Sequence, residues 1–369
     1  MNTDQNAAKT RKVPWRLIWT LVGALSLVWL LATTPLEEAW QEASAIGAAM
    51  ALVVMVAPLW FAANAVALWQ LTGRTIGLGH LFYNQMVGDA LGAMLPVAGI
   101  GGEPFKLGHL RRWLSVEEAS QALVYDRLLH ALSGLLYLAG LLAVSAWLVA
   151  LPAHLLTAFV GVSVALVVVS GALLMLTLSS APSKALKGLL GRFKLVGRLQ
   201  ALPKLPASTL LKALGAKLVG RVAHMPELWL IAVLMGMDGS LGQVALIGAM
   251  LTGSSLLFFV VPQGLGVNEA GVTGAFSLLG LGAPQGLAFA LVRRARVLFW
   301  IGVGVTVVSL GRLRPAAPQV AITDAATTAS IQRALATVRH GVPPAGLPTG
   351  LGTASLRSPT PRTSLRSTP

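Results

Sequence analysis

Two sets of acidic and basic residues lie within or beside long apolar segments of this chain. In the first set Glu103 is followed by Arg127, and in the second set Glu269 is followed by Arg293. An arginine in or near membrane hydrocarbon costs about 3 kcal/mol, so it normally faces the protein interior and has a partner. We therefore predict the ion pairs Glu103–Arg127 and Glu269–Arg293.

The second set carries more positive charge than one acid can balance. Arg293, Arg294 and Arg296 lie on a single segment, and no acid is near them in sequence. An anionic head group, such as a lipid phosphate, would satisfy the surplus through forked hydrogen bonds. The alternative is that these arginines reach a membrane interface or form structural ion pairs, and the sequence leaves both interpretations open.

Two further polar residues accompany these charges. Asp126 lies four residues before His130, so the two share a helix face beside Arg127. Asn268 adjoins Glu269 and is either a ligand-binding group or a hydrogen-bonding link between helices. We expect Asp126 and Asn268 to join the two glutamates and the four arginines in one lipid-binding site.

Each set is associated with a turn rich in proline and glycine. Residues that are 166 positions apart match at the turn proline, at the glutamate and at the arginine, which indicates an internal repeat. The glycines of the two turns are out of step by one residue, so the match is imperfect. The turn residues are Pro96, Gly99, Gly101 and Gly102 in the first turn, and Pro262, Gly264 and Gly266 in the second.

The segments that carry these residues are apolar enough to lie in a membrane. Charged residues make up 11% of the chain, whereas a soluble domain has about 25%. A membrane crossing needs about 20 apolar residues, and the sequence predicts crossings at 15–33, 47–71, 122–151, 155–178, 225–239 and 285–310. The stretches 82–100 and 243–281 are broken by the turns, and we expect re-entrant hairpins there because irregular backbone at membrane depth must line a cavity or be buried.

The distribution of basic residues predicts the orientation. Residues 1–14 are basic, and the stretch 182–224 has nine Lys or Arg and no acid, so both should be cytoplasmic. The basic stretch is either an amphipathic helix on anionic lipid or a solvated loop. It explains the net charge of +15 better than a nucleic-acid partner does. The tail 315–369 lacks the apolar density to order itself, and we expect it to be a disordered cytoplasmic segment.

One crossing separates two similar units, at about 47–150 and 213–312. An odd number of intervening crossings turns the second unit upside down, which predicts inverted repeats. Broken helices at corresponding positions of inverted halves are typical of a transporter with a site near the bilayer midplane. The alternative is a duplication retained for packing alone. The predicted fold is therefore an all-α polytopic membrane protein with about six transmembrane helices and two re-entrant hairpins in inverted repeats.

Signatures of enzymes are absent from the sequence. The chain has no cysteine, which excludes disulfides and thiolate metal sites. The six histidines do not reach metal-ligand spacing, and neither a phosphate-binding G-x-x-x-x-G-K-[ST] loop nor a G-x-S-x-G motif occurs. We predict no metal, no cofactor and no catalytic residue.

The motifs resemble a known family. Gly101-Gly102-Glu103-Pro104, Tyr125-Asp126-Arg127 and the run from Pro262 to Glu269 are similar to the transmembrane region of lysylphosphatidylglycerol synthases, and most of all to the hopanoid-biosynthesis-associated HpnL-like membrane proteins. The resemblance covers about residues 10–314. It implies a multi-pass protein of the bacterial inner membrane that acts on or translocates lipids, with both termini cytoplasmic.

By the same resemblance, the glutamate positions of the family fall on Glu103 and Glu269, and its basic pair falls on Arg127 and Arg293. The aminoacyl-transferase domain that follows in the synthases has no counterpart in the residues after 314, so we expect no synthase activity. The resulting hypothesis is a protein that binds or translocates an anionic or hopanoid-type lipid. The alternatives are a membrane-embedded lipid-modifying enzyme and a non-catalytic scaffold for lipid or hopanoid biosynthesis.

Overall fold

The computed structural model describes residues 36–94, 101–178, 203–258, 261 and 264–311, together with positions 28 and 32. Within these ranges every regular element is a helix, as predicted. The elements are α2 (Leu36–Ala45), the 3₁₀ helix η1 (Gly47–Ala49), α3 (Met50–Leu71), α4 (Leu78–Met94), α5 (Glu103–Leu110), α6 (Val116–Leu148), α7 (Ala153–Leu178), α10 (Ala207–Val222), α11 (His224–Leu234), α12 (Leu241–Leu257), α13 (Val267–Leu278) and α14 (Ala283–Gly311).

Three of the described helical segments are long and apolar enough to cross a membrane: Gly47–Leu71, Val116–Leu148 and Ala153–Leu178. They coincide with three of the predicted crossings. The predicted crossing 15–33, the basic N-terminus and the tail 315–369 lie outside the described residues. Helix α14 spans 29 residues over the last predicted crossing.

The predicted crossing 225–239 needs correction. Helix α11 covers only 11 residues and follows α10 after the single residue Ala223. Pro226 lacks a backbone N–H and therefore interrupts the hydrogen-bond ladder where the two helices meet. Residues 207–222 form the helix α10 rather than a solvated loop, and this helix packs against α3 and α6.

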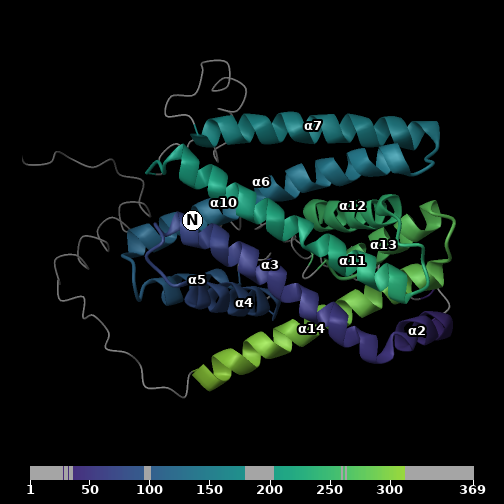
Figure 1. Ribbon diagram of the computed structural model, residues 1–369, viewed down its shortest axis with the longest axis horizontal. Coiled ribbons are helices and arrows are strands. Elements are labelled where there is room, and N and C mark those ends of the chain that lie inside the picture. The colour runs from purple at the N-terminus through teal and green to yellow at the C-terminus, as the bar shows by residue number, and fades with distance from the viewer. Residues whose placement is uncertain are drawn as a thin grey trace, which may run out of the picture. The chain divides into compact units, whose positions relative to one another are not determined.

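The helices form two units of the same order, joined by α7. In the first unit α3 precedes the short pair α4 and α5, and α6 follows; in the second, α10 with α11 precedes α12 and α13, and α14 follows. Figure 1 shows that α3 and α10 run in opposite directions, as do α6 and α14. The α4–α5 pair lies at one end of the bundle and the α12–α13 pair at the other, which is the inverted arrangement that the odd number of intervening helices predicts.

The two short pairs have the dimensions of re-entrant hairpins. Helix α5 has 8 residues and α13 has 12. At 1.5 Å per residue these helices are about 12 and 18 Å long, well short of the about 30 Å of hydrocarbon in a bilayer. Helices α4 and α12 have 17 residues each, about 26 Å, so none of the four helices reaches across the hydrocarbon, as re-entrant hairpins require.

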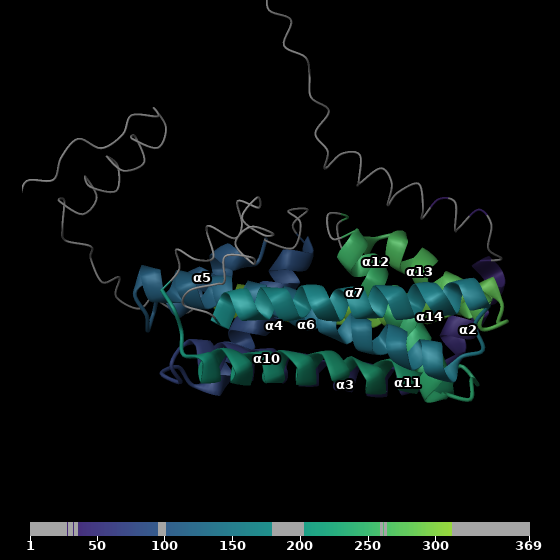
Figure 2. The same ribbon diagram turned by 90° about the horizontal axis from the view of Figure 1, so that it is seen from above.

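Each hairpin packs against the last helix of the other unit. Helix α4 contacts α14, and α12 contacts α6. Gly304 of α14 lies so close to Ala90 of α4 that a Cβ at position 304 would collide with it, and Gly248 of α12 faces Leu141 of α6. Helix α3, the first of one unit, and helix α10, the first of the other, also pack along each other (Figure 2). The repeats are thus interlocked rather than adjacent.

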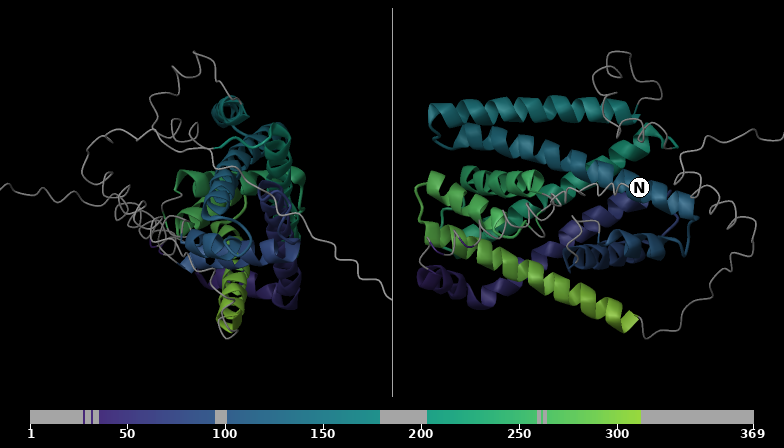
Figure 3. Two further views of the ribbon diagram at one scale, coloured as in Figure 1. Left: turned by 90° about the vertical axis from the view of Figure 1, so that its left-hand side faces the viewer. Right: turned by 180° about the vertical axis from the view of Figure 1, so that it is seen from behind.

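Helix α7 lies at the edge of the bundle, as Figure 3 shows end on. It packs mainly against α6, and several of its valines are more than half exposed, including Val164, Val167 and Val168. These side chains would face lipid, because an exposed apolar face on a membrane-spanning helix is solvated by hydrocarbon.

Candidate functional site

A buried lysine holds the first hairpin together. Lys106 on α5 donates to Oε1 of Gln85 at 2.7 Å and pairs with Oδ1 of Asp89 at 2.8 Å, both on α4. The side-chain amide of Asn84 donates to the Lys106 carbonyl oxygen at 3.0 Å. Buried charges are tolerated when they are paired and hydrogen-bonded, so these contacts fix the two short helices as one body.

The predicted ion pair of the first set is present. Glu103 is the first residue of α5, and Arg127 of α6 donates from Nε to Glu103 Oε1 at 2.7 Å. A second guanidinium nitrogen contacts the same oxygen. The position also suits a carboxylate because the N-terminus of a helix carries partial positive charge.

The ion pair of the second set forms with a different arginine from the one predicted. Glu269 is the third residue of α13, and its Oε2 accepts a hydrogen bond from Gly266 N–H at 2.7 Å. Its Oε1 accepts from Nε of Arg294 at 2.9 Å. The predicted partner, Arg293, lies one residue earlier on α14 and therefore points about 100° away around the helix.

Two residues of α6 face two residues of α10 in a ladder. Asp126 pairs with Nζ of Lys217 at 2.6 Å. One turn further along, His130 Nε2 lies 3.0 Å from an Nη atom of Arg221. Because guanidinium nitrogens only donate, this histidine nitrogen must accept, and the ring is neutral. Both α10 residues belong to the basic stretch for which the sequence left a lipid-bound helix and a solvated loop open, and Lys217 is 1% exposed.

An acid on α11, Glu227, balances the third arginine of α14. Arg296 donates from Nε to Oε1 of Glu227 at 2.9 Å, and both side chains are buried. His224 also contacts Glu227, at 3.3 Å. Two of the three arginines of α14 are therefore paired with an acid, Arg294 with Glu269 and Arg296 with Glu227.

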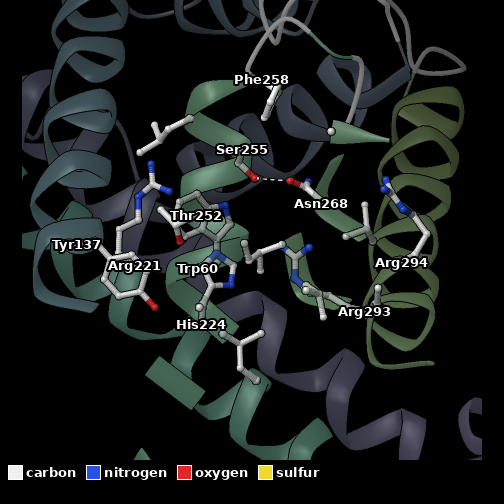
Figure 4. A pocket seen from close by; sticks show the side chains of 18 of the residues that line it. Trp60, Tyr137, Arg221, His224, Thr252, Ser255, Phe258, Asn268, Arg293 and Arg294 are labelled. Atoms are coloured by element: carbon white, nitrogen blue, oxygen red, sulfur yellow. Dashed lines mark hydrogen bonds between the residues drawn. The ribbon is translucent and has the colours of Figure 1, made fainter. Parts of the chain in front are cut away.

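A cavity of about 690 Å³ lies among the two units (Figure 4). Its wall combines apolar side chains with polar residues of both units. The polar and aromatic lining residues are Trp60, Arg127, His130, Tyr137, Arg221, His224, Thr252, Ser255, Phe258, Asn268, Glu269, Arg293 and Arg294. The volume is within the range of about 300–1,000 Å³ that small-molecule sites occupy.

One corner of the cavity holds a rigid guanidinium. Arg221 lies over the ring of Trp60, with its guanidinium carbon 5.4 Å from the ring centroid. It also donates to the carbonyl oxygen of His130 at 3.1 Å, and the ring of His224 lies 4.7 Å from Trp60. Stacking and hydrogen bonding together fix the orientation of this cation.

Arg293 approaches the cavity from α14, opposite this corner. Its guanidinium points toward Trp60 and His224 in Figure 4. Among the described residues no carboxylate lies within ion-pair distance of Arg293 or of Arg221, and every ion pair found there involves another lysine, arginine or histidine. The cavity therefore has two cations without an acidic partner in the described part of the chain.

The predicted site residues divide into two groups. The cavity is lined by Arg127, Arg293, Arg294, Glu269, Asn268 and Gly264. Glu103, Asp126, Arg296, Gly101, Gly102 and Gly266 are not among its lining residues, and three of these are held in ion pairs. Pro96, Gly99 and Pro262 lie outside the described residues.

Asn268 and the closely packed glycines reinforce the hairpins. Asn268 Oδ1 accepts from the hydroxyls of Ser254 and Ser255 of α12 at 2.9 and 3.0 Å (dashed line to Ser255 in Figure 4). Gly102 lies against the carbonyl oxygen of Gly88, where a Cβ would collide with it. Asn268 thus links the two helices of the second hairpin, as one of its two interpretations predicted.

Sequence reasoning missed Trp60, Tyr137, Arg221 and His224 in the cavity wall. The sequence does contain one signal for Arg221. Lys217 and Arg221 are four residues apart, as are Asp126 and His130, so each pair shares one face of a helix and the two faces are complementary.

Comparison with known proteins identifies a family but no near relative. Neither the curated proteins nor the solved structures contain a match to this chain. A model of one family, the lysylphosphatidylglycerol synthase TM region, matches residues 17–305. This range holds every described helix except the end of α14. The chain is therefore a membrane protein that belongs to the lysylphosphatidylglycerol synthase transmembrane-region family.

Proposed function

We propose that this protein binds the anionic head group of a membrane lipid in the cavity and moves that lipid between the two leaflets. The observation that carries the proposal is the pair of arginines, Arg221 and Arg293, which line the cavity without an acidic partner in the described residues. Uncompensated arginines inside a membrane protein are costly, and an anionic ligand would remove that cost.

The position of the cavity supports transport of the bound lipid rather than binding alone. Its wall includes Arg127 of the first unit and Arg293 of the second, so it lies where the inverted units meet. Sites at the interface of inverted repeats are typical of transporters, because one unit can open while the other closes. The hairpins are the elements suited to this exchange, since each is short and contacts the last helix of the other unit.

The chemistry of the wall fits an amphipathic ligand. Beside the arginines lie apolar side chains, among them Leu228, Leu251 and Val272. The guanidiniums would hold the phosphate through forked hydrogen bonds, and acyl chains would lie along the apolar wall or in the surrounding bilayer. Glu103 and Glu269 would act at the margin of the site by keeping Arg127 and Arg294 in place.

A reconstituted-liposome assay tests the proposal. Proteoliposomes that contain a fluorescently labelled anionic phospholipid are treated with a membrane-impermeant quencher, and the accessible fraction is followed over time. We expect the quencher to reach more than half of the label in liposomes that contain the wild-type protein, because lipid from the inner leaflet keeps arriving in the outer leaflet. Arg221→Ala with Arg293→Ala should reduce the rate at least tenfold.

Arg112→Ala is the matched control, because it removes one positive charge from an exposed position. It should transport at the wild-type rate. Circular dichroism and gel filtration check that each variant is folded. Wild-type liposomes that behave like protein-free liposomes, or a double variant as fast as the wild type, would overturn the proposal.

A further inference from the structure

The balance of charge around the cavity can be counted almost completely. The chain has 13 acidic residues, and only Asp4 and Asp324 lie outside the described residues. Five acids are taken by lysines or arginines, in the pairs Asp89–Lys106, Glu103–Arg127, Asp126–Lys217, Glu227–Arg296 and Glu269–Arg294.

The other described acids do not line the cavity. They lie on α2, at the start of α6 and before α12, and they are Glu37, Glu38, Glu42, Glu117, Glu118 and Asp238. Within the described chain, Arg221 and Arg293 are therefore left with two positive charges and no carboxylate. The partner of Arg221, His130, is a neutral hydrogen-bond acceptor and adds no negative charge.

The described wall of the cavity offers no site for a positive group on the ligand. Glu269 is the one acid among the described lining residues, and both of its oxygens are engaged, Oε1 by Arg294 and Oε2 by Gly266 N–H. A head group with an amine would bring a third cation next to two uncompensated ones. Like charges at close range repel, so amine-bearing lipids fit this site poorly.

Two polar atoms at the corner of the cavity that holds Arg221 also lack hydrogen-bond partners among the described residues. Nε of Arg221 and the hydroxyl of Tyr137 are buried, and neither has a hydrogen-bond partner among the described residues. Both residues line the cavity. Buried polar groups are normally satisfied, and a ligand with several acceptor oxygens would supply what the protein leaves open.

Resting on the proposed function, we infer that the site selects a lipid whose head group ends in a phosphate monoester, with two negative charges and no amine. Such a phosphate has three terminal oxygens and a charge of about −2 above pH 7. It can neutralise both guanidiniums, whereas a phosphodiester with one negative charge leaves one of them uncompensated.

The test compares lipids that differ only in the head group. Purified protein in detergent is titrated at pH 8 with phosphatidic acid, phosphatidylglycerol or phosphatidylethanolamine of identical acyl chains, and binding is measured by native mass spectrometry. We expect phosphatidic acid to bind at least tenfold more tightly than phosphatidylglycerol, which corresponds to about 1.4 kcal/mol. Phosphatidylethanolamine should bind most weakly.

Charge variants locate the effect. Arg293→Gln should reduce the preference for phosphatidic acid to within about twofold while phosphatidylglycerol still binds, and Arg221→Gln should do the same. The exposed control Arg112→Gln should keep the full preference. Glycerol 3-phosphate supplies the same phosphate without acyl chains and should compete poorly.

The outcomes separate the two proposals. If no lipid binds, the proposed function fails. If phosphatidic acid and phosphatidylglycerol bind the wild type equally, or if both glutamine variants keep the preference, only the present inference fails. If glycerol 3-phosphate binds as tightly as phosphatidic acid, the ligand is a soluble phosphate ester and the inference of a lipid is wrong.

Discussion

The buried pair Asp126–Lys217 gives the sharpest test of how α6 and α10 are held together. The two charged atoms are 2.6 Å apart, and the side chains are 7% and 1% exposed. Lys217 also donates to Asn64 Oδ1 at 2.8 Å. The change Asp126→Asn keeps the shape of the side chain but leaves the lysine charge buried with neutral acceptors alone.

The size of the effect follows from the distance. At 2.6 Å and an effective dielectric constant of about 20, the attraction is about 6 kcal/mol. Part of this offsets the cost of removing both ions from water, and breaking a buried pair by removing one partner typically costs about 3–5 kcal/mol. We expect Asp126→Asn to lower the free energy of unfolding by that amount. Adding Lys217→Gln removes the stranded charge and should recover at least about 2 kcal/mol.

The assay is equilibrium unfolding in mixed micelles of mild detergent and SDS, followed by circular dichroism. The four proteins of the cycle are the wild type, both single variants and the double variant, and Glu118→Gln at the exposed start of α6 is the control. If the effects of the two single variants add within about 0.5 kcal/mol, the residues do not interact and the helix pairing described above is wrong.

Two further changes test the packing of the hairpin and the start of α6. Gly102→Ala should destabilise the α4–α5 hairpin by at least about 2 kcal/mol, because its Cβ would collide with backbone atoms of Gly88. The control is Gly108→Ala within α5: its Cβ meets nothing within 4 Å, and it should be neutral or stabilising in the same unfolding assay. Ser115→Ala removes the hydroxyl that accepts from Glu118 N–H at 3.2 Å, and loss of such a helix cap should cost about 1 kcal/mol. Hydrogen exchange in the first turns of α6 measures the loss, and unchanged protection there would contradict the prediction.

The fold was largely predictable because the signals are large and local. Long runs without charge predict membrane helices, and the matched Glu103 and Glu269 reveal the repeat. The prediction of the partner of Glu103 was correct because one arginine is within reach. It was wrong for Glu269, because three arginines stand together on α14 and one residue changes the direction of a side chain by about 100°.

The glycine mismatch between the turns already indicated this difference. Glu103 is the first residue of α5, whereas Glu269 is the third residue of α13. The two glutamates therefore leave their helices at different angles, and their partners are not at equivalent positions. A repeat identified from identical residues gives the topology but not the orientation of each side chain.

The partners of the basic stretch show a second limit. Lys217 and Arg221 were counted as cytoplasmic because basic residues outside apolar runs normally mark that side. Here they face Asp126 and His130 on another helix, and such a long-range pairing is invisible to any local average of composition. The pair with Asp126 makes the buried charge of Lys217 tolerable, whereas the basic composition alone indicates exposure to water.

The interlocking of the two units has a consequence for how this protein is made. Helix α4 cannot meet its contact partner α14 until roughly 190 further residues have been synthesised. A ribosome adds about 5–20 residues per second, so the first hairpin waits about 10–40 s with the face around Ala90 uncovered. During that interval the nascent chain needs the translocon or an insertase beside it, and a truncation before α14 should leave a target for membrane proteases rather than a stable half.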